Sequence, residues 1–147
     1  MSEKKLRTTP DNALNALSSL LGDILDDLTI VELYSTLGQP ARRFLAEGAS
    51  QAVAVNDEFP EEAEDAEGLV RIPMEPLDFL GEQRVRDVGL IYSLPPYDSE
   101  ANKSVLQKLP TSPVLTDNCL VVLQEATWNH TQIEDYEGFT PIEEYRF

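Results

Sequence analysis

Few side chains of this sequence are of types that carry out chemistry. Its one cysteine, Cys119, and its one histidine, His130, exclude an internal disulfide and a thiol or imidazole metal site built from this chain alone. A histidine without a fixed partner seldom does catalysis, so we expect a surface or packing role for His130. Tyr97 follows Pro95-Pro96 and could stack on a ligand, although a tyrosine after two prolines is more often a packed turn residue. Leu94, before the prolines, cannot accept a hydrogen bond through its side chain.

Carboxylates gather between residues 57 and 67, where seven stand with only Ala, Phe and Pro between them. Such a segment cannot bury apolar surface, so we expect a solvated acidic loop over residues 57–68. The functional alternative is a Ca²⁺ or Mg²⁺ site, but the segment lacks the Asp-x-Asp-x-Asp-Gly turn that wraps oxygen ligands around calcium. We therefore favour the loop.

The charge of the chain limits its partners. Eleven Lys+Arg against 27 Asp+Glu give a formal net charge of -16, and a field of this sign repels polyanions such as nucleic acids. No apolar run approaches the roughly 20 residues of a membrane helix, and residues 1–10 are polar rather than a signal sequence. We expect a cytoplasmic protein with neither a membrane nor a nucleic acid as partner.

The elements that must position these side chains alternate between helix and strand. Thr9 and Pro10 are typical of an N-cap and a first helical residue, and helical spacing continues through Ala13, Leu14, Leu17, Leu20, Leu21, Ile24 and Leu25. Buried strands are expected at residues 28–34, 51–55, 69–72, 89–93 and 120–123, helices at 40–46 and 102–109, and a final strand at 139–147. This order, in 147 residues of which 41% are hydrophobic, predicts one α/β layered domain over residues 1–147.

Seven segments, in order along the chain, resemble one protein family. Residues 30–49, IVELYSTLGQPARRFLAEGA, are similar to the first strand, cofactor loop and following helix of the bacterial 16S rRNA guanine-N2 methyltransferases, the RsmD type. Residues 6–22 resemble that family's opening helix, 50–57 its second strand and 69–80 its third strand with an acidic turn. Residues 87–109 stand where the family has its Pro-Pro-Tyr catalytic motif, and 115–126 and 138–147 resemble its fifth strand and the segment leading to the end of the fold. The resemblance implies a shortened Rossmann-like class I methyltransferase fold, a three-layer α/β sandwich with a mostly parallel sheet.

The resemblance also implies S-adenosylmethionine (SAM) as the cofactor. Glu32 matches the acidic residue that ends the first strand, and Asn56 matches the ribose-binding acidic residue, with Asp57 beside it as a substitute. Glu75 matches the acidic residue near the adenine amino group, and a solvent-facing turn acid is an equally good interpretation. The complete set of cofactor positions is Glu32, Tyr34, Gly38, Asn56, Asp57 and Glu75.

Several family features are missing at the matching positions. Only Gly38 remains of the glycine-rich loop, with Thr36 and Ala41 at its first and last glycine positions, and Pro40 removes one N–H donor. The catalytic motif is degenerate, because a leucine stands where the family has an Asp or Asn that holds the target amino group; its residues are Leu94, Pro95, Pro96 and Tyr97. Losing such an acceptor costs roughly two or three powers of ten in rate. We expect weakened SAM binding and weakened catalysis.

The chain is also shorter than the family pattern. The helix between the second and third strands is missing, as are the amino-terminal β-hairpin that engages RNA and the last antiparallel strand. Loss of that strand would leave an unpaired sheet edge, which a protein partner or a second copy could cover.

Three functions are compatible with this pattern. The first is a methyltransferase-like protein without catalytic activity, a pseudoenzyme that acts through protein contacts. The second is a divergent active SAM-dependent methyltransferase on RNA, protein or a small molecule. The third is a subunit that caps an active methyltransferase through its exposed edge and acidic face.

Overall fold

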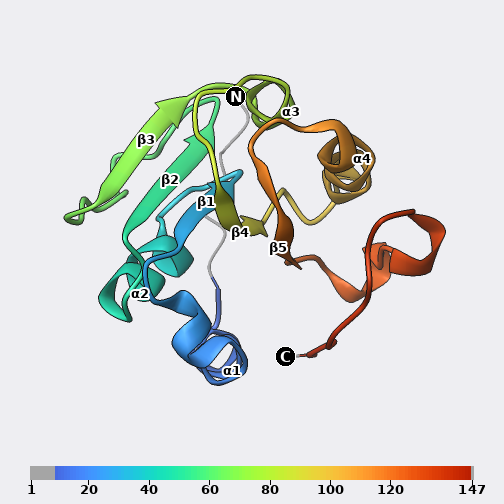
Figure 1. Cartoon of the computed structure of the whole chain (residues 1–147), viewed down its shortest axis with the longest axis horizontal. Helices are drawn as coiled ribbons and strands as arrows, with labels where there is room; N and C mark the ends of the chain where they lie inside the picture. The colour runs from blue at the N-terminus through green and yellow to red at the C-terminus, as the bar shows by residue number, and fades with distance from the viewer. Residues whose placement is uncertain (1–8, 147) are drawn as a thin grey trace.

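The computed structural model describes residues 9–146, and helices and strands alternate along it except between the second and third strands, which a loop joins (Figure 1). Two elements precede the sheet, the helix α1 (Asp11–Leu21) and the 3-10 turn η1 (Gly22–Leu25). The remaining elements, in chain order, are β1 (Thr29–Leu33), α2 (Gln39–Ala46), β2 (Gln51–Asn56), β3 (Leu69–Pro73), α3 (Pro76–Leu80), β4 (Val88–Ser93), α4 (Ala101–Lys108), η2 (Leu109–Thr111), β5 (Leu115–Leu123), η3 (Thr127–Asn129) and η4 (Ile133–Asp135).

The five strands form one parallel sheet in the order β3-β2-β1-β4-β5. The central strand β1 pairs on both sides, so that Val31 lies opposite Val53 of β2 and Ile91 of β4. Its short apolar sequence is what a strand covered on both faces requires. The predicted α/β class with a parallel sheet is therefore confirmed.

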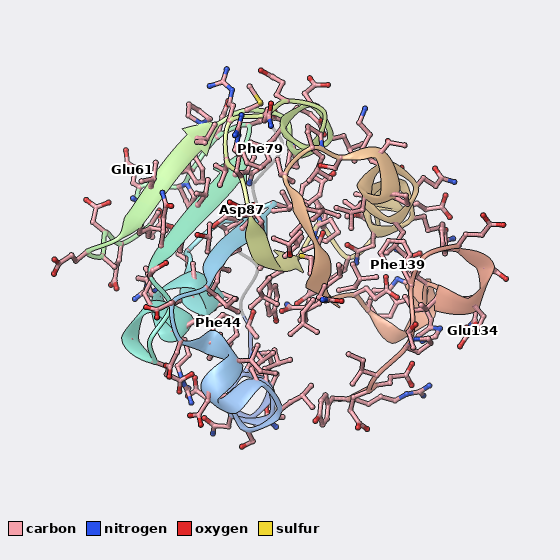
Figure 2. The ribbon with its side chains drawn as sticks, in the orientation of Figure 1. Phe44, Glu61, Phe79, Asp87, Glu134 and Phe139 are labelled. Atoms are coloured by element: carbon pink, nitrogen blue, oxygen red, sulfur yellow. The ribbon has the colours of Figure 1, made fainter. Side chains whose placement is uncertain are left out.

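Helices cover both faces of the sheet (Figure 1). On one face α1 and α2 pack over a cluster that contains Leu17, Leu21, Ile30, Phe44 and Leu90. On the other face α3 and α4 pack over a second cluster that contains Val31, Val53, Phe79, Ile91 and Val105. Figure 2 shows the two aromatic side chains, Phe44 and Phe79, on their opposite sides of the sheet.

The opening helix differs from the prediction at its first residue. Thr9 is not the N-cap: that position belongs to Pro10, and no side chain of the described residues caps the helix. Thr9 instead donates its hydroxyl to Gln124, 2.7 Å away and 115 residues further along the chain. A tertiary hydrogen bond has replaced the local one. At the other end Gly22, with φ of 50°, stops the α-helix and begins the 3-10 turn.

No helix joins β2 to β3, as expected, and the acidic loop of residues 57–68 lies there instead. Its carboxylates are exposed, but two arginines hold it against the sheet. Arg71 of β3 binds Asp65 and the carbonyl oxygen of Glu64 and lies 5.9 Å from the ring of Phe59, while Arg42 of α2 binds Glu64 at 2.7 Å. The loop is solvated on its outer side and anchored on its inner side.

The segment after β3 contains a helix that the sequence analysis took for a turn. Pro76 is its first residue, a position where proline loses no intrahelical hydrogen bond, and the Glu75 side chain accepts from the Asp78 N–H at 2.9 Å. Both start signals are present in the sequence, but α3 has only five residues, too few to show helical periodicity.

The predicted final strand at 139–147 is wrong for the part described, because residues 139–146 have no regular structure. Phe139 packs against the cluster under α3 and α4, and Thr131 binds Glu125 through its N–H and its hydroxyl. Side-chain contacts rather than strand pairing hold this tail.

Among the described residues, no helix combines the length and the apolar character needed to cross a bilayer.

Candidate functional site

The carboxyl ends of all five strands meet at one edge of the sheet, where parallel α/β proteins bind ligands. The residues that follow β1, β2, β3, β4 and β5 at this edge are Tyr34, Asp57, Met74, Leu94 and Gln124. The topology therefore brings the predicted cofactor and catalytic positions to the same end of the molecule.

Glu32 in β1 is fully buried, and the structure uses its carboxylate internally. One oxygen accepts a hydrogen bond from the Ser35 hydroxyl, and the other accepts from the Ala41 N–H at 2.9 Å. Burial raises the pKa of the Glu32 carboxyl, and these two hydrogen bonds partly offset that effect. Glu32 thus ties the loop after β1 to the first turn of α2.

Two backbone N–H groups in the first turn of α2 are bound within the chain, and a third position has no N–H. Pro40 has no N–H, the Ala41 N–H is bound to Glu32, and the Arg42 N–H donates to the Gly38 carbonyl at 2.9 Å. Gly38 has φ of 79°, and a Cβ there would come no closer than 4.0 Å to another side chain or backbone atom. The glycine is needed for its left-handed backbone rather than for a close approach.

Asn56, at the end of β2, holds the same loop from the other side. Its amide donates to the Ser35 carbonyl at 2.9 Å, and its side-chain oxygen accepts the Asp57 N–H at 2.9 Å. Both ends of the side chain are therefore engaged within the chain. The Asp57 side chain is exposed.

Tyr34 adopts φ of 59°, an unusual conformation for an aromatic residue. Its ring is half-buried at the sheet edge, and burial together with the nearby Glu75 and Asp57 carboxylates raises its pKa to about 12. The structure thus brings three predicted cofactor positions, Tyr34, Asp57 and Glu75, within electrostatic reach of one another. Backbone strain of this kind is concentrated at functional sites in proteins.

The Leu94-Pro95-Pro96-Tyr97 segment leaves β4 at this edge. The Leu94 N–H donates to the Leu33 carbonyl at 3.2 Å, and its side chain is only 2% exposed, within the cluster under α1 and α2. Leu94 therefore contributes to the core. Tyr97 is 39% exposed, and its hydroxyl lies 3.4 Å from the Gln124 amide nitrogen.

Gln124, which the sequence analysis did not single out, joins three segments at this edge. Its side-chain oxygen accepts from the Thr9 hydroxyl at 2.7 Å and from the Tyr92 hydroxyl at 2.8 Å, and its amide nitrogen reaches Tyr97. Gln39, at the start of α2, accepts the Thr9 N–H at 2.9 Å. The sequence does contain a signal for this role, because Gln124 is a polar residue directly after a strand that was predicted to be buried.

A second polar network lies beside the Pro-Pro-Tyr segment and was also not foreseen. The Ser93 hydroxyl donates to Asn102 at 2.7 Å, and the Asn102 amide donates to the Gln124 carbonyl at 3.3 Å and to Glu125 at 3.2 Å. Glu125 also accepts from Thr131, and Ser93, Asn102 and Thr131 are all buried. This network fastens α4 and the tail to the sheet.

Two hollows of the described surface lie away from this edge. One of about 340 Å³ is bounded by α4 and residues 135–137, and one of about 700 Å³ is bounded by α2 and residues 66–68.

The same arrangement of strands and helices occurs in solved structures. A proposed methyltransferase of Escherichia coli, YhhF, superposes with a TM-score of 0.69 and 17% identity over 83% of this chain and 73% of YhhF. The chain has the fold of class I SAM-dependent methyltransferases. A conserved hypothetical protein of Streptococcus pyogenes gives a TM-score of 0.63 with 18% identity over 76% of this chain and 74% of that protein. A proposed RNA methyltransferase of Pyrococcus horikoshii gives 0.53 with 22% identity over 73% of this chain and 57% of that protein.

No model of a protein family matches the sequence, and a search of curated proteins finds no match. The likeness therefore concerns the methyltransferase-like fold with its parallel sheet.

Proposed function

We propose that this chain is a non-catalytic protein on a methyltransferase-like scaffold and that it acts through protein contacts. The observation that carries the proposal is the position of Leu94, whose side chain is 2% exposed in the core. The resemblance places the acceptor for a target amino group there, and a buried alkyl group offers none. Transfer of a methyl group to an amine would lack its orienting group.

The residues at the cofactor edge also do not fit SAM. In the resembling family the loop after the first strand approaches the cofactor through glycines and offers N–H donors to it. Here the Ala41 and Arg42 N–H groups of the first turn of α2 are bound to Glu32 and Gly38, Pro40 has no N–H, and the Asn56 amide is bound to Ser35. Binding SAM would require breaking internal hydrogen bonds, which costs about 1–3 kcal/mol for each buried group left unpaired.

The surface best suited to a protein contact is the outer edge of β5. Within residues 9–146 no strand pairs with that edge. The Gln124 N–H donates inward to the Ser93 carbonyl at 2.8 Å, so strand alternation turns the N–H groups of Val121 and Leu123 outward. The last four residues of β5 are apolar and only partly buried. An edge of this kind is a template for a further strand.

A second copy of the chain is the partner we propose for this edge. Two β5 edges have the same length and composition and can pair antiparallel about a two-fold axis. Because each copy carries a formal charge of -16, the dimer should tighten as salt screens the repulsion.

Sedimentation velocity of the purified chain at low and high salt tests this contact. We expect a dimer that strengthens with salt and dissociates in Leu123→Pro, which removes an outward N–H. Leu123→Ala is the matched control, because it shortens the side chain but keeps the N–H. A chain that stays monomeric at high salt, or a Leu123→Pro variant that dimerises as the parent does, would overturn the proposed contact.

An active methyltransferase on RNA, protein or a small molecule is the second candidate. It is favoured by one observation, the half-exposed Tyr97 at the carboxyl end of β4, where a ring could stack on a substrate. Incubation with methyl-labelled SAM and cellular RNA or protein distinguishes the active methyltransferase from the non-catalytic protein. Label transfer that is lost in Tyr97→Ala and kept in Tyr97→Phe would favour this candidate over the first.

A further inference from the structure

The hollow of about 700 Å³ lies beside α2, away from the cofactor edge and from β5. It is bounded by the carboxyl-terminal half of α2, by the residues just before β2 and by the end of the acidic loop. Its lining consists of Arg42, Leu45, Ala46, Ala49, Ser50, Ala66, Glu67 and Gly68. The side chains that form it are mostly small and apolar.

The hollow exists because one helix is missing from this face of the sheet. Parallel strands are normally joined through a crossover helix, but residues 57–68 join β2 to β3 as a loop. Figure 1 shows α1 and α2 on this face, and within residues 9–146 no further helix lies beyond α2 toward β3. A strip beside α2 is thereby left without a covering element.

The floor of the hollow is tightly built. At Gly68, with φ of 88°, a Cβ would lie 3.2 Å from the Leu45 side chain and 3.5 Å from the Ser50 carbonyl oxygen. The contact with Leu45 is tighter than most Cβ contacts, and the positive φ also disfavours a side chain, so glycine suits this close approach of the entry to β3 to α2. Leu45 and Leu69 pack on the cluster beneath, and both remain only partly buried.

The rim of the hollow is acidic. Glu67 belongs to the lining, and the acidic loop that ends there carries further exposed carboxylates. Arg42, the one cation of the lining, has a nitrogen bound to Glu64, while its Nε is buried without a hydrogen-bond partner among the described residues.

We propose that this hollow is the docking groove for an amphipathic helix of a partner protein, with small apolar residues on one face and lysine or arginine on its flank. The apolar face covers Leu45, Ala46 and Ala49, in the way that helices fill apolar grooves. The basic flank lies over the acidic loop and satisfies its charge.

This contact involves neither the β5 edge nor the cofactor edge. Its test can therefore fail or succeed separately from the tests of dimerisation and of SAM binding. The probe is a fluorescein-labelled synthetic helix with Ala and Leu on one face and Lys on the other. The control peptide has the same composition in a scrambled order, so that it keeps the charge and loses the face. Fluorescence anisotropy against the full chain should give a Kd of roughly 10 µM for the amphipathic peptide and at least about tenfold weaker binding for the scrambled one.

Two pairs of variants locate the binding. Ala46 is exposed, so Ala46→Trp fills the hollow without disturbing the core and should weaken binding at least about tenfold, whereas Ala46→Ser should not. Glu67→Gln should weaken binding more than Glu134→Gln, which removes an exposed charge of the tail. Circular dichroism confirms that each variant folds. Equal binding of the scrambled peptide, no binding of the amphipathic one, or full binding by Ala46→Trp would overturn the proposal.

Discussion

The carboxylate of Glu32 and the backbone N–H of Ala41 form a buried hydrogen bond of 2.9 Å that joins β1 to the first turn of α2. Gly38, at the N-cap, has no side chain with which to cap the helix, so a residue in the preceding strand supplies the cap. A negative group at this helix end is also favoured by the helix dipole. The same contact occupies a donor that the cofactor edge would otherwise offer to a ligand.

Glu32 should give the chain a specific pH dependence. Burial raises the pKa of its carboxyl above the ordinary 4.5, so the folded chain holds the proton at a pH where the unfolded chain has lost it. The stability from this group is fully present below the ordinary pKa and is lost as the pH rises through the raised one. Each pKa unit between the folded and the unfolded chain corresponds to about 1.4 kcal/mol in the free energy of unfolding.

Urea unfolding of the parent and of Glu32→Gln between pH 4 and pH 8 measures this effect. Relative to the variant, the parent should lose free energy of unfolding as the pH rises, because glutamine does not titrate. The pH dependence that comes from the other carboxylates is the same in both proteins, so it drops out of the difference between them. A difference between the two that stays constant with pH would show that the Glu32 pKa is not raised.

Gly38→Ala should destabilise the chain by about 1 kcal/mol, through backbone conformation alone. The φ of 79° is unfavourable for alanine, whereas the nearest atom to its Cβ is 4.0 Å away and causes no clash. Gly38→Asn should cost less, because asparagine tolerates the left-handed region. Thermal unfolding of the two variants checks the order, and an asparagine variant less stable than the alanine one would contradict it.

Restoring an acceptor at residue 94 should not restore an enzyme. Leu94→Asn places an amide among the apolar side chains under α1 and α2, and we expect a loss of about 3 kcal/mol or more in the free energy of unfolding. Leu94→Met, which keeps the volume, should cost less than about 1.5 kcal/mol. A stable Leu94→Asn variant that transfers label from SAM would show that residue 94 faces a site.

The network around Asn102 should contribute strongly to the attachment of the tail. Asn102→Ala leaves the Ser93 hydroxyl without its acceptor and removes one of the donors to the Glu125 carboxylate, and we expect a loss of about 1–3 kcal/mol in the free energy of unfolding. Asn118→Ala, at an exposed position of β5, is the matched control and should stay within about 0.5 kcal/mol. Limited proteolysis after residue 130 should accelerate in the first variant only. Equal rates of proteolysis in the two variants would show that the Asn102 network does not hold the tail to the sheet.

The sheet and the larger helices could be predicted because their signals are local. Short apolar runs such as that of β1 are typical of strands covered on both faces, and Leu14, Leu17 and Leu21 follow the helical period on the buried side of α1. The absence of a helix between β2 and β3 was equally visible, because the acidic loop has no apolar stripe.

The features that were not foreseen depend on distant parts of the chain. Thr9 has the residue type of an N-cap, but its hydroxyl binds Gln124. The tail around Phe139 has enough alternation for a strand, yet strands form only where a neighbour pairs with them, and Phe139 packs on a cluster instead. Likewise, the sequence reveals that Leu94 lacks an acceptor, but only the packing places that side chain in the core.

Calorimetric titration of SAM and S-adenosylhomocysteine into the purified chain tests the central claim most directly. The internal hydrogen bonds of Glu32, Asn56 and the first turn of α2 predict no saturable heat with either ligand at millimolar concentration. Saturable binding with a Kd below about 100 µM would contradict the account, because the cofactor edge would then be available to a ligand.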